Sequence, residues 1–157
     1  MEKDNPGLIM PPPFYPALSW LAALGLQWLH PLHLIPPFGL SSWAFWLGLL
    51  LAVAGFAVVN RAIAAFQAAG TNVMPSQPTL VVVSTGPYRF SRNPIYIGCL
   101  MLHLGLTLMA GLNWGLPLLP LVLVAFHLLA VLPEERYLQR KFGDSYTRYQ
   151  AATRRWL

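Results

Sequence analysis

Long apolar stretches without a charged residue alternate with short polar segments along the whole chain. Three such stretches, residues 42–59, 95–112 and 114–132, contain 18 or 19 residues each. A helix of about 20 residues crosses a hydrocarbon core of about 30 Å, so each stretch is long enough to span a membrane. A fourth, residues 15–35, is apolar but becomes polar toward its end. We predict an all-α, polytopic membrane protein with four transmembrane helices, over about 15–35, 42–60, 94–112 and 114–132.

The remaining segments read as a loop and an amphipathic tail. Residues 70–93 begin with glycine, contain several prolines and show no helical period, so we expect a loop. After the fourth span, Pro133 suits the first position of a new helix. Residues 133–157 then carry an apolar stripe, formed by Leu138, Phe142, Tyr146 and Tyr149. This spacing predicts one C-terminal amphipathic helix. The whole chain, residues 1–157, is interpreted as a single membrane domain.

The charges predict an orientation. Of 157 residues 56% are hydrophobic and 10% charged, which lies outside the soluble globular class. All ten Lys and Arg, from Lys3 onward, precede span one, separate spans two and three, or follow span four. Because Lys and Arg mark the cytoplasmic side, we expect both termini in the cytoplasm. The net charge of +5 is then explained by topology and attraction to anionic membrane lipids, so no nucleic-acid partner is predicted.

The N-terminal segment bears on the membrane in which the protein is expected. The N-terminus has no basic region leading into a short apolar segment with a cleavage site, and the chain is compact, which favours a bacterial inner membrane. The oligomeric state is left open by the sequence.

Two distant polar clusters are expected to meet. The third span ends at residue 112 and the fourth begins at Trp114, so the Asn113–Trp114 dipeptide permits only a tight antiparallel hairpin. Their cytoplasmic ends then lie side by side. This places Tyr88–Tyr96 next to Pro133–Tyr149, although about forty residues separate these segments in the chain. The sequence therefore predicts one polar site on the cytoplasmic face.

The first cluster has the chemistry of an anion site. Asn93 is placed as an N-cap and Pro94 as the first residue of the third span. The N-terminus of a helix, with Arg89 and Arg92 beside it, can bind a carboxylate or a phosphate. Cytoplasmic arginines, a good cap and interfacial tyrosines explain the same residues without a ligand, and both interpretations stay open.

The second cluster is the acidic pair Glu134 and Glu135 at the end of the fourth span. Acids at a membrane boundary are costly to desolvate unless they are paired, and Arg89, Arg92 or Arg136 could pair with them. A carboxylate there could bind an ammonium group or hydroxyls. Surface acids favoured by the helix dipole are the alternative. No metal site is predicted, because the four histidines are scattered between outer and mid-membrane positions and there is one cysteine.

Together the motifs GPYRFSRNPIYIG, EERYLQRKFGDSYTRY and RRWL resemble the isoprenylcysteine carboxyl methyltransferase and phospholipid methyltransferase superfamily. The resemblance covers residues 70–157. It implies a membrane enzyme that transfers a methyl group from S-adenosylmethionine to a lipophilic small molecule or lipid. The cofactor residues that it implies are Leu80, Val81, Val82, Val83, Tyr88, Asn93, Pro94, Ile95, Tyr96 and Glu134.

Two positions depart from the superfamily pattern. Asn93 stands where histidine is commonest, and Ala130 stands where the isoprenylcysteine enzymes carry an arginine proposed to meet the substrate carboxylate. Glu135 and Arg92 are the expected catalytic residues. An amine acceptor needs a base, for which Glu135 or Glu134 is nearest, whereas a carboxylate or thiolate needs none.

Two other hypotheses stay open. One is a small four-span transporter or lipid-binding protein without catalysis, although a transporter of ions is expected to carry an acid within a span and this chain has none. The other is a relative that keeps the cofactor pocket without transfer activity.

Overall fold

The structure, a computed structural model, describes residues 4–157, and this part of the chain is helical without a named strand. The predicted all-α class is thus confirmed. Lys3, expected on the cytoplasmic side, lies outside the described residues. The elements are α1 (Phe14–Leu29), α2 (Trp43–Ala68), a 3-10 turn η1 (Gly86–Arg89), α3 (Pro94–Ala110), α4 (Gly115–Phe126), a π-helical turn η2 (His127–Val131), α5 (Leu132–Phe142) and α6 (Asp144–Ala152).

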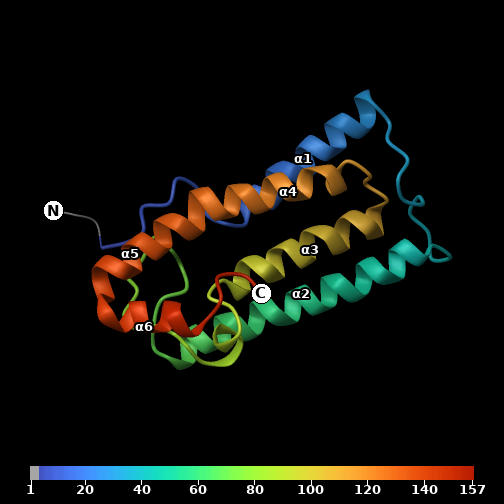
Figure 1. The fold of residues 1–157 in the computed structure, drawn as a ribbon. Coiled ribbons are helices and arrows are strands. Elements are labelled where there is room, and N and C mark those ends of the chain that lie inside the picture. Colours follow the sequence, from blue (N-terminus) through green and yellow to red (C-terminus); the bar gives the residue numbers. More distant parts are fainter. Residues whose placement is uncertain (1–3) are drawn as a thin grey trace.

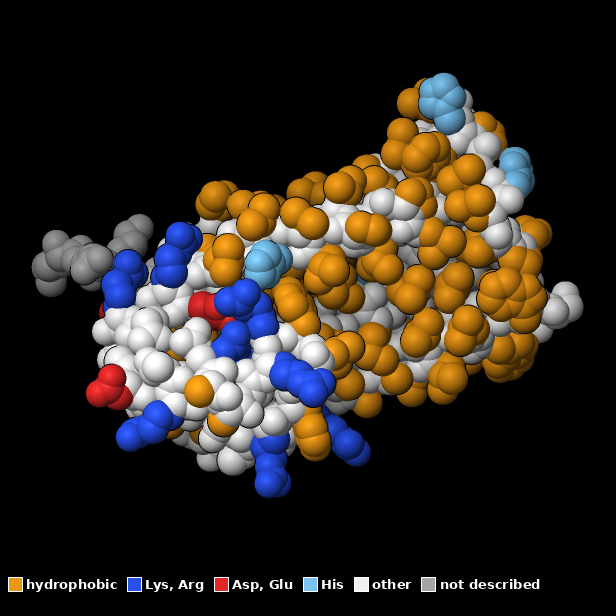
Figure 2. Space-filling view, in the orientation of Figure 1, with side chains coloured by type: hydrophobic (Ala, Val, Ile, Leu, Met, Phe, Trp, Pro, Cys, Tyr) orange, Lys and Arg blue, Asp and Glu red, His pale blue; other side chains and the backbone are white. Residues whose placement is uncertain are grey.

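Within residues 4–157, two helices are long and apolar enough to cross a membrane. They are Trp43–Ala68 and the continuous helix Gly115–Phe142, while Pro94–Ala110 is a shorter apolar helix. In Figure 1, α1 lies along α4 and α2 lies along α3, and the loop 70–93, α5, α6 and the C-terminal residues gather at one end. Figure 2 shows hydrophobic side chains over the helical body and Lys and Arg around that end. We call it the polar end.

Helices α2 and α3 pack through glycines. A Cβ atom on Gly48 would lie 2.5 Å from the carbonyl oxygen of Gly105, and one on Gly55 would lie 2.7 Å from that of Gly98. The two glycines of each helix are seven residues apart and so lie on one face. Close backbone packing of this kind stabilises helix pairs in lipid, where the surrounding chains are as apolar as the side chains. The contact therefore sets the position of α3.

The connection between α3 and α4 is the predicted tight hairpin. Gly111 ends α3 in the left-handed conformation (φ 64°), which glycine adopts without steric cost. The side-chain oxygen of Asn113 accepts hydrogen bonds from the N–H groups of Leu34 and Ile35. The hairpin is thereby tied to the connection between α1 and α2.

The first helix is shorter than predicted. It ends at Leu29 instead of continuing to residue 35. Pro31, Pro36 and Pro37 follow within eight residues, and proline lacks the N–H that a continuing helix needs. Helix α2, in contrast, runs beyond the predicted residue 60 to Ala68.

Pro133 lies in the first turn of α5, as predicted, but α5 is not separated from the helix before it. Helix α4 continues through η2 into α5 without a break. In a regular α-helix the Pro133 ring would clash with the carbonyl of Leu129, and the wider π turn that precedes it relieves this contact. The Glu134 and Glu135 pair is consequently carried by the same long helix that forms the hairpin with α3.

The prediction of a single amphipathic helix over residues 133–157 is wrong, because the structure has two helices there, α5 and α6. Gly143 breaks it with φ 51° and ψ −125°, a conformation that favours glycine, and separates α5 from α6. The bend folds α6 back beneath the polar end (Figure 1). The stripe residue Tyr146 is buried there with 2% of its surface exposed.

Exchanging one glycine of the α2–α3 contact tests its importance. We expect Gly55→Ala to lower the free energy of unfolding by about 1–3 kcal/mol, because the added methyl group has no space beside the Gly98 carbonyl. The matched control is Gly25→Ala in α1, where nothing lies within 4 Å of the added atom. There alanine should stabilise the helix by up to about 1 kcal/mol. Thermal unfolding in detergent measures both, and equal effects would contradict the close packing.

Candidate functional site

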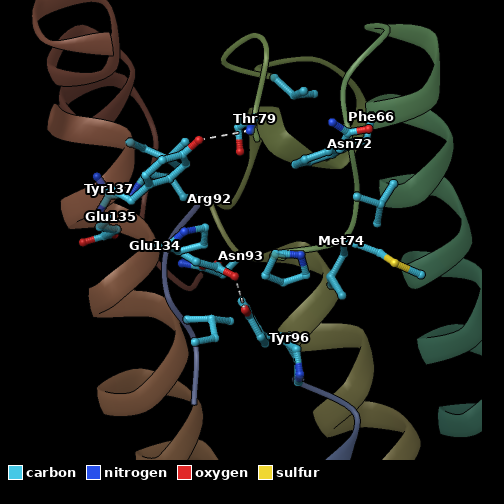
Figure 3. A pocket seen from close by; sticks show the side chains of 18 of the residues that line it. Phe66, Asn72, Met74, Thr79, Arg92, Asn93, Tyr96, Glu134, Glu135 and Tyr137 are labelled. Carbon is cyan, nitrogen blue, oxygen red and sulfur yellow. Dashed lines mark hydrogen bonds and ion pairs between the residues drawn. The ribbon is translucent and has the colours of Figure 1, made fainter. Parts of the chain in front are cut away.

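A cavity of about 730 Å³ lies at the polar end, within the 300–1,000 Å³ range of small-molecule sites. Its walls come from α2, the loop 70–93, the first turns of α3, α5, α6 and residues 5–13. Figure 3 shows α5 on one side of this cavity and α2 on the other, with α3 between them. Segments from both halves of the chain therefore enclose one space.

Most of the residues predicted from the sequence line this cavity. They are Val81, Val82, Val83, Tyr88, Arg92, Asn93, Ile95, Tyr96, Glu134 and Glu135. The other two, Leu80 and Pro94, do not line this cavity, and their contact with the cofactor stays a prediction. Leu80 is 60% exposed, because its N–H bonds to the Thr71 hydroxyl and its side chain turns outward, and Pro94 is buried in the first turn of α3.

Inside the cavity a hydrogen bond between Tyr96 and Glu134 links the two distant clusters. The Tyr96 hydroxyl, on α3, donates to Glu134 Oε1, on α5, over 2.7 Å (Figure 3). Tyr96 is buried against Phe126, with ring centroids 4.9 Å apart, so its hydroxyl is held in place. The second carboxylate oxygen of Glu134 accepts no hydrogen bond from the residues that the structure describes. Glu134 therefore keeps an acceptor for a ligand.

Glu135 is held by two arginines. Its Oε1 lies 3.1 Å from a terminal nitrogen of Arg92, while the Arg155 Nε and a terminal nitrogen donate to Oε1 and Oε2 over 3.0 and 2.8 Å. Arg92 was among the expected partners, whereas Arg155 was not, and the side chains of Arg89 and Arg136 are exposed. The side chains of Arg92 and Glu135 are each 10% exposed. Two positive charges around one carboxylate explain how it can be buried.

Arg92 keeps unused donor capacity at the cavity. One terminal nitrogen donates to the carbonyl of Gln150 over 3.1 Å, and another pairs with Glu135. The Nε atom is buried without a hydrogen-bond partner among the described residues. A buried donor without a partner is costly. The Arg92 side chain also lines the cavity, where its positive charge suits an anionic ligand.

Asn93 occupies the predicted N-cap position, but its side chain does not cap α3. The Asn93 Nδ2 donates instead to the carbonyl of Arg155 over 2.8 Å, and the Ser91 hydroxyl accepts from the Asn93 N–H over 3.1 Å. The turn before α3 is thus tied to the C-terminal residues.

An aromatic wall closes the side of the cavity near α2. Tyr88 is buried against Phe66, with ring centroids 5.1 Å apart, and the Tyr149 hydroxyl donates to the Tyr88 carbonyl over 2.8 Å. Burial raises the pKa of Tyr88 and also that of Tyr149, the latter to about 12. Both phenols are therefore neutral near pH 7 and present flat, uncharged rings.

Sequence reasoning missed the N-terminal wall. Residues 5–8 and 11–13 line the cavity. They are held by the Asn5 side chain, which donates to the Ser76 carbonyl, and by Asp4, which accepts from the Tyr137 hydroxyl and from Lys141. These contacts join residues more than 70 positions apart, and no local pattern in the sequence indicates them. The wall residues Val59, Ile63 and Phe66 of α2 were missed for the same reason.

The phospholipid methyltransferase family matches this chain over residues 43–145. The chain belongs to that family. The matched range runs from the start of α2 into α6 and contains the Tyr96–Glu134 hydrogen bond. The superfamily resemblance of the two motifs is thereby confirmed, and with it a methyltransferase family associated with membranes.

The chain is also similar to one bacterial protein over part of its length. An uncharacterized protein from Haemophilus influenzae is 41% identical over 66 residues, which make up 40% of this chain and 100% of that protein. No solved structure gives a significant match.

Neutralising Glu135 tests the double ion pair. We expect Glu135→Gln to lower the free energy of unfolding by about 3 kcal/mol, because it leaves the buried Arg92 guanidinium without a negative partner. The matched control is Asp144→Asn, an exposed acid in the first turn of α6, which should cost less than about 1 kcal/mol. Thermal unfolding in detergent measures both values. A loss as small as that of the control would show that the ion pair contributes no stability.

Proposed function

We propose that this protein transfers a methyl group from S-adenosylmethionine to a lipophilic acceptor at the cytoplasmic face of a membrane. Membership of the phospholipid methyltransferase family supports methyl transfer to a lipid-related molecule. The observation that carries the proposal is the meeting of Arg92, Tyr96 and Glu134 in one cavity. These residues come from two separate motifs.

The cavity fits the chemistry of this cofactor. The Arg92 guanidinium and the start of α3 suit its carboxylate, because both offer donors and positive charge. The free oxygen of Glu134 suits an ammonium group or a ribose hydroxyl. Tyr88, Phe66 and the valines at 81–83 form a flat apolar wall that suits adenine.

The proposed membrane arrangement keeps four spans. Besides the two long apolar helices, α1 and α3 contain 16 and 17 residues, or about 25 Å of helix. A bilayer that thins locally, or flanking residues that reach the interface, would accommodate this length. The arginine-rich polar end then faces the cytoplasm, with both termini on that side. A bacterial inner membrane remains our expectation for the location.

The residues would act by positioning and by excluding water. When bound, S-adenosylmethionine supplies an activated methyl group. Arg92 and Glu134, which lie close together in the cavity, would hold the donor in a fixed position, which removes much of the entropic cost of aligning it with the acceptor. The apolar lining from Val59, Ile63 and Cys99 keeps water out and offers a surface for a lipophilic acceptor that enters from the bilayer.

The lining favours an amine or a thiol over a carboxylate as the acceptor group. Arg92 is the single Lys or Arg among the described lining residues, and it already faces Glu135. Ala130 is fully buried in the apolar core and offers no charge for a substrate carboxylate. For an amine, Glu134 is the nearest base. Both oxygens of Glu135 are engaged by arginines, so we assign it to holding Arg92 in place.

Calorimetric titration of S-adenosylmethionine into the detergent-purified protein tests the proposal. We expect micromolar binding to the wild type and at least tenfold weaker binding to Glu134→Gln, in which an amide replaces the carboxyl group that faces the cavity. Asp144→Asn, on the exposed side of α6, should bind within twofold of the wild type. A folded wild type that gives no heat would exclude the proposal and favour a lipid-binding or transport protein.

A second pair of variants locates the anion contact. Arg92→Ala should weaken cofactor binding at least tenfold, because it removes the donor at the cavity wall, whereas Arg148→Ala, on an exposed residue of α6, should leave it unchanged. The same titration measures both. If the two variants weakened binding equally, the carboxylate would not lie at Arg92.

A further inference from the structure

We propose that the C-terminal segment, residues 153–156, positions the Arg92–Asn93 turn for ligand binding and that Arg155 is the positioning residue. The expected effect of Arg155 on cofactor binding rests on the proposed function, whereas its effect on the order of the turn does not. The family match ends at residue 145, so this role falls to residues beyond the matched range.

The segment runs beside the turn that precedes α3. The Arg92 N–H donates to the Arg154 carbonyl over 2.9 Å, and Ser91 and Arg154 form a parallel β-bridge. The Arg155 carbonyl accepts from the Ser91 hydroxyl over 3.2 Å and from the Asn93 side chain over 2.8 Å. Three consecutive residues of the turn thus bond to two consecutive residues of the C-terminal segment.

The turn has few other means of staying ordered. Asn93 makes no cap on α3 with its side chain, and Ser91 and Asn93 are buried with 3% and 7% of their surface exposed. Buried polar groups need hydrogen-bond partners, and the C-terminal segment supplies them. Without it, the N–H of Arg92 and the amide of Asn93 would lose the partners that they have here.

The Arg155 side chain makes the same connection through Glu135. It binds this carboxylate with two parallel hydrogen bonds, and Glu135 in turn pairs with Arg92. A bidentate arginine fixes the carboxylate plane, which a single point charge would not do. Arg155 does not line the cavity, so it acts on the site through its neighbours.

The segment is anchored at both of its ends. Thr153 is buried and caps the end of α6, its N–H donating to the Tyr149 carbonyl over 3.0 Å. Trp156 packs against the apolar core around Phe126, with its ring centroid 6.3 Å from that of His127. The residues between the anchors are therefore held against the turn.

Neighbouring arginines provide a matched pair of variants. Arg155→Ala removes the bidentate contact, while Arg154→Ala removes the same charge from an exposed side chain and keeps the backbone carbonyl. In the detergent-purified full chain, we expect Arg155→Ala to speed amide hydrogen exchange over residues 91–96 at least tenfold. The dissociation constant of S-adenosylmethionine should rise at least fivefold. Arg154→Ala should change both by less than twofold.

The outcomes separate the positioning role from general stability. Faster exchange confined to residues 91–96, with partial recovery in Arg155→Lys, supports the proposal. Exchange in Arg155→Ala within twofold of the wild type, or equal effects of Arg154→Ala, overturns it. If Arg155→Ala does not fold, Arg155→Lys, which keeps the charge but loses the bidentate fork, replaces it and must still speed exchange at residues 91–96.

The same measurements separate this role from the proposed function. A wild type that binds no cofactor, while exchange over residues 91–96 still responds to Arg155→Ala, overturns the proposed function and leaves the ordering of the turn supported.

Discussion

A buried carboxylate at the end of an apolar helix must be neutralised, and much of the polar end is organised around this requirement. Glu135 meets it with two guanidiniums, one from the turn before α3 and one from the C-terminal segment. Three segments that are far apart in the chain are therefore fixed relative to one another by one group. The neighbouring acid, Glu134, is then free to face the cavity.

This organisation also depends on where α3 begins. The glycine contact fixes where α3 lies along α2. The tight hairpin then fixes the position of α4 and α5 relative to α3. The π turn before Pro133 changes the rotation of the helix at the point where the two acids follow. Tyr96 and Glu134 reach hydrogen-bond distance because these three features act together.

The cavity combines a charged surface with an apolar one, which suits a charged methyl donor and a lipophilic acceptor. Its charged groups are few and each has a defined neighbour, while the rest of the lining is mainly apolar or aromatic. Two of its supports, residues 4–13 and the C-terminal segment, lie outside the range that matches the phospholipid methyltransferase family. The matched range thus supplies Arg92, Tyr96 and Glu134, and the two chain ends brace the walls around them.

The sequence by itself determined the all-helical class and the hairpin after α3, and ten of the twelve site residues predicted from it line the cavity. The helical class follows from local periodicity, and the hairpin follows from loop length. The meeting of the charged groups follows from the hairpin, whereas the other site residues were implied by the resemblance to the superfamily. Only the tertiary structure decided that Arg155 pairs with Glu135, that residues 5–13 and α2 form walls, and that α4 passes through Pro133 into α5. Such contacts join residues up to 137 positions apart, and they depend on backbone distances and helix rotations that no short stretch of sequence encodes.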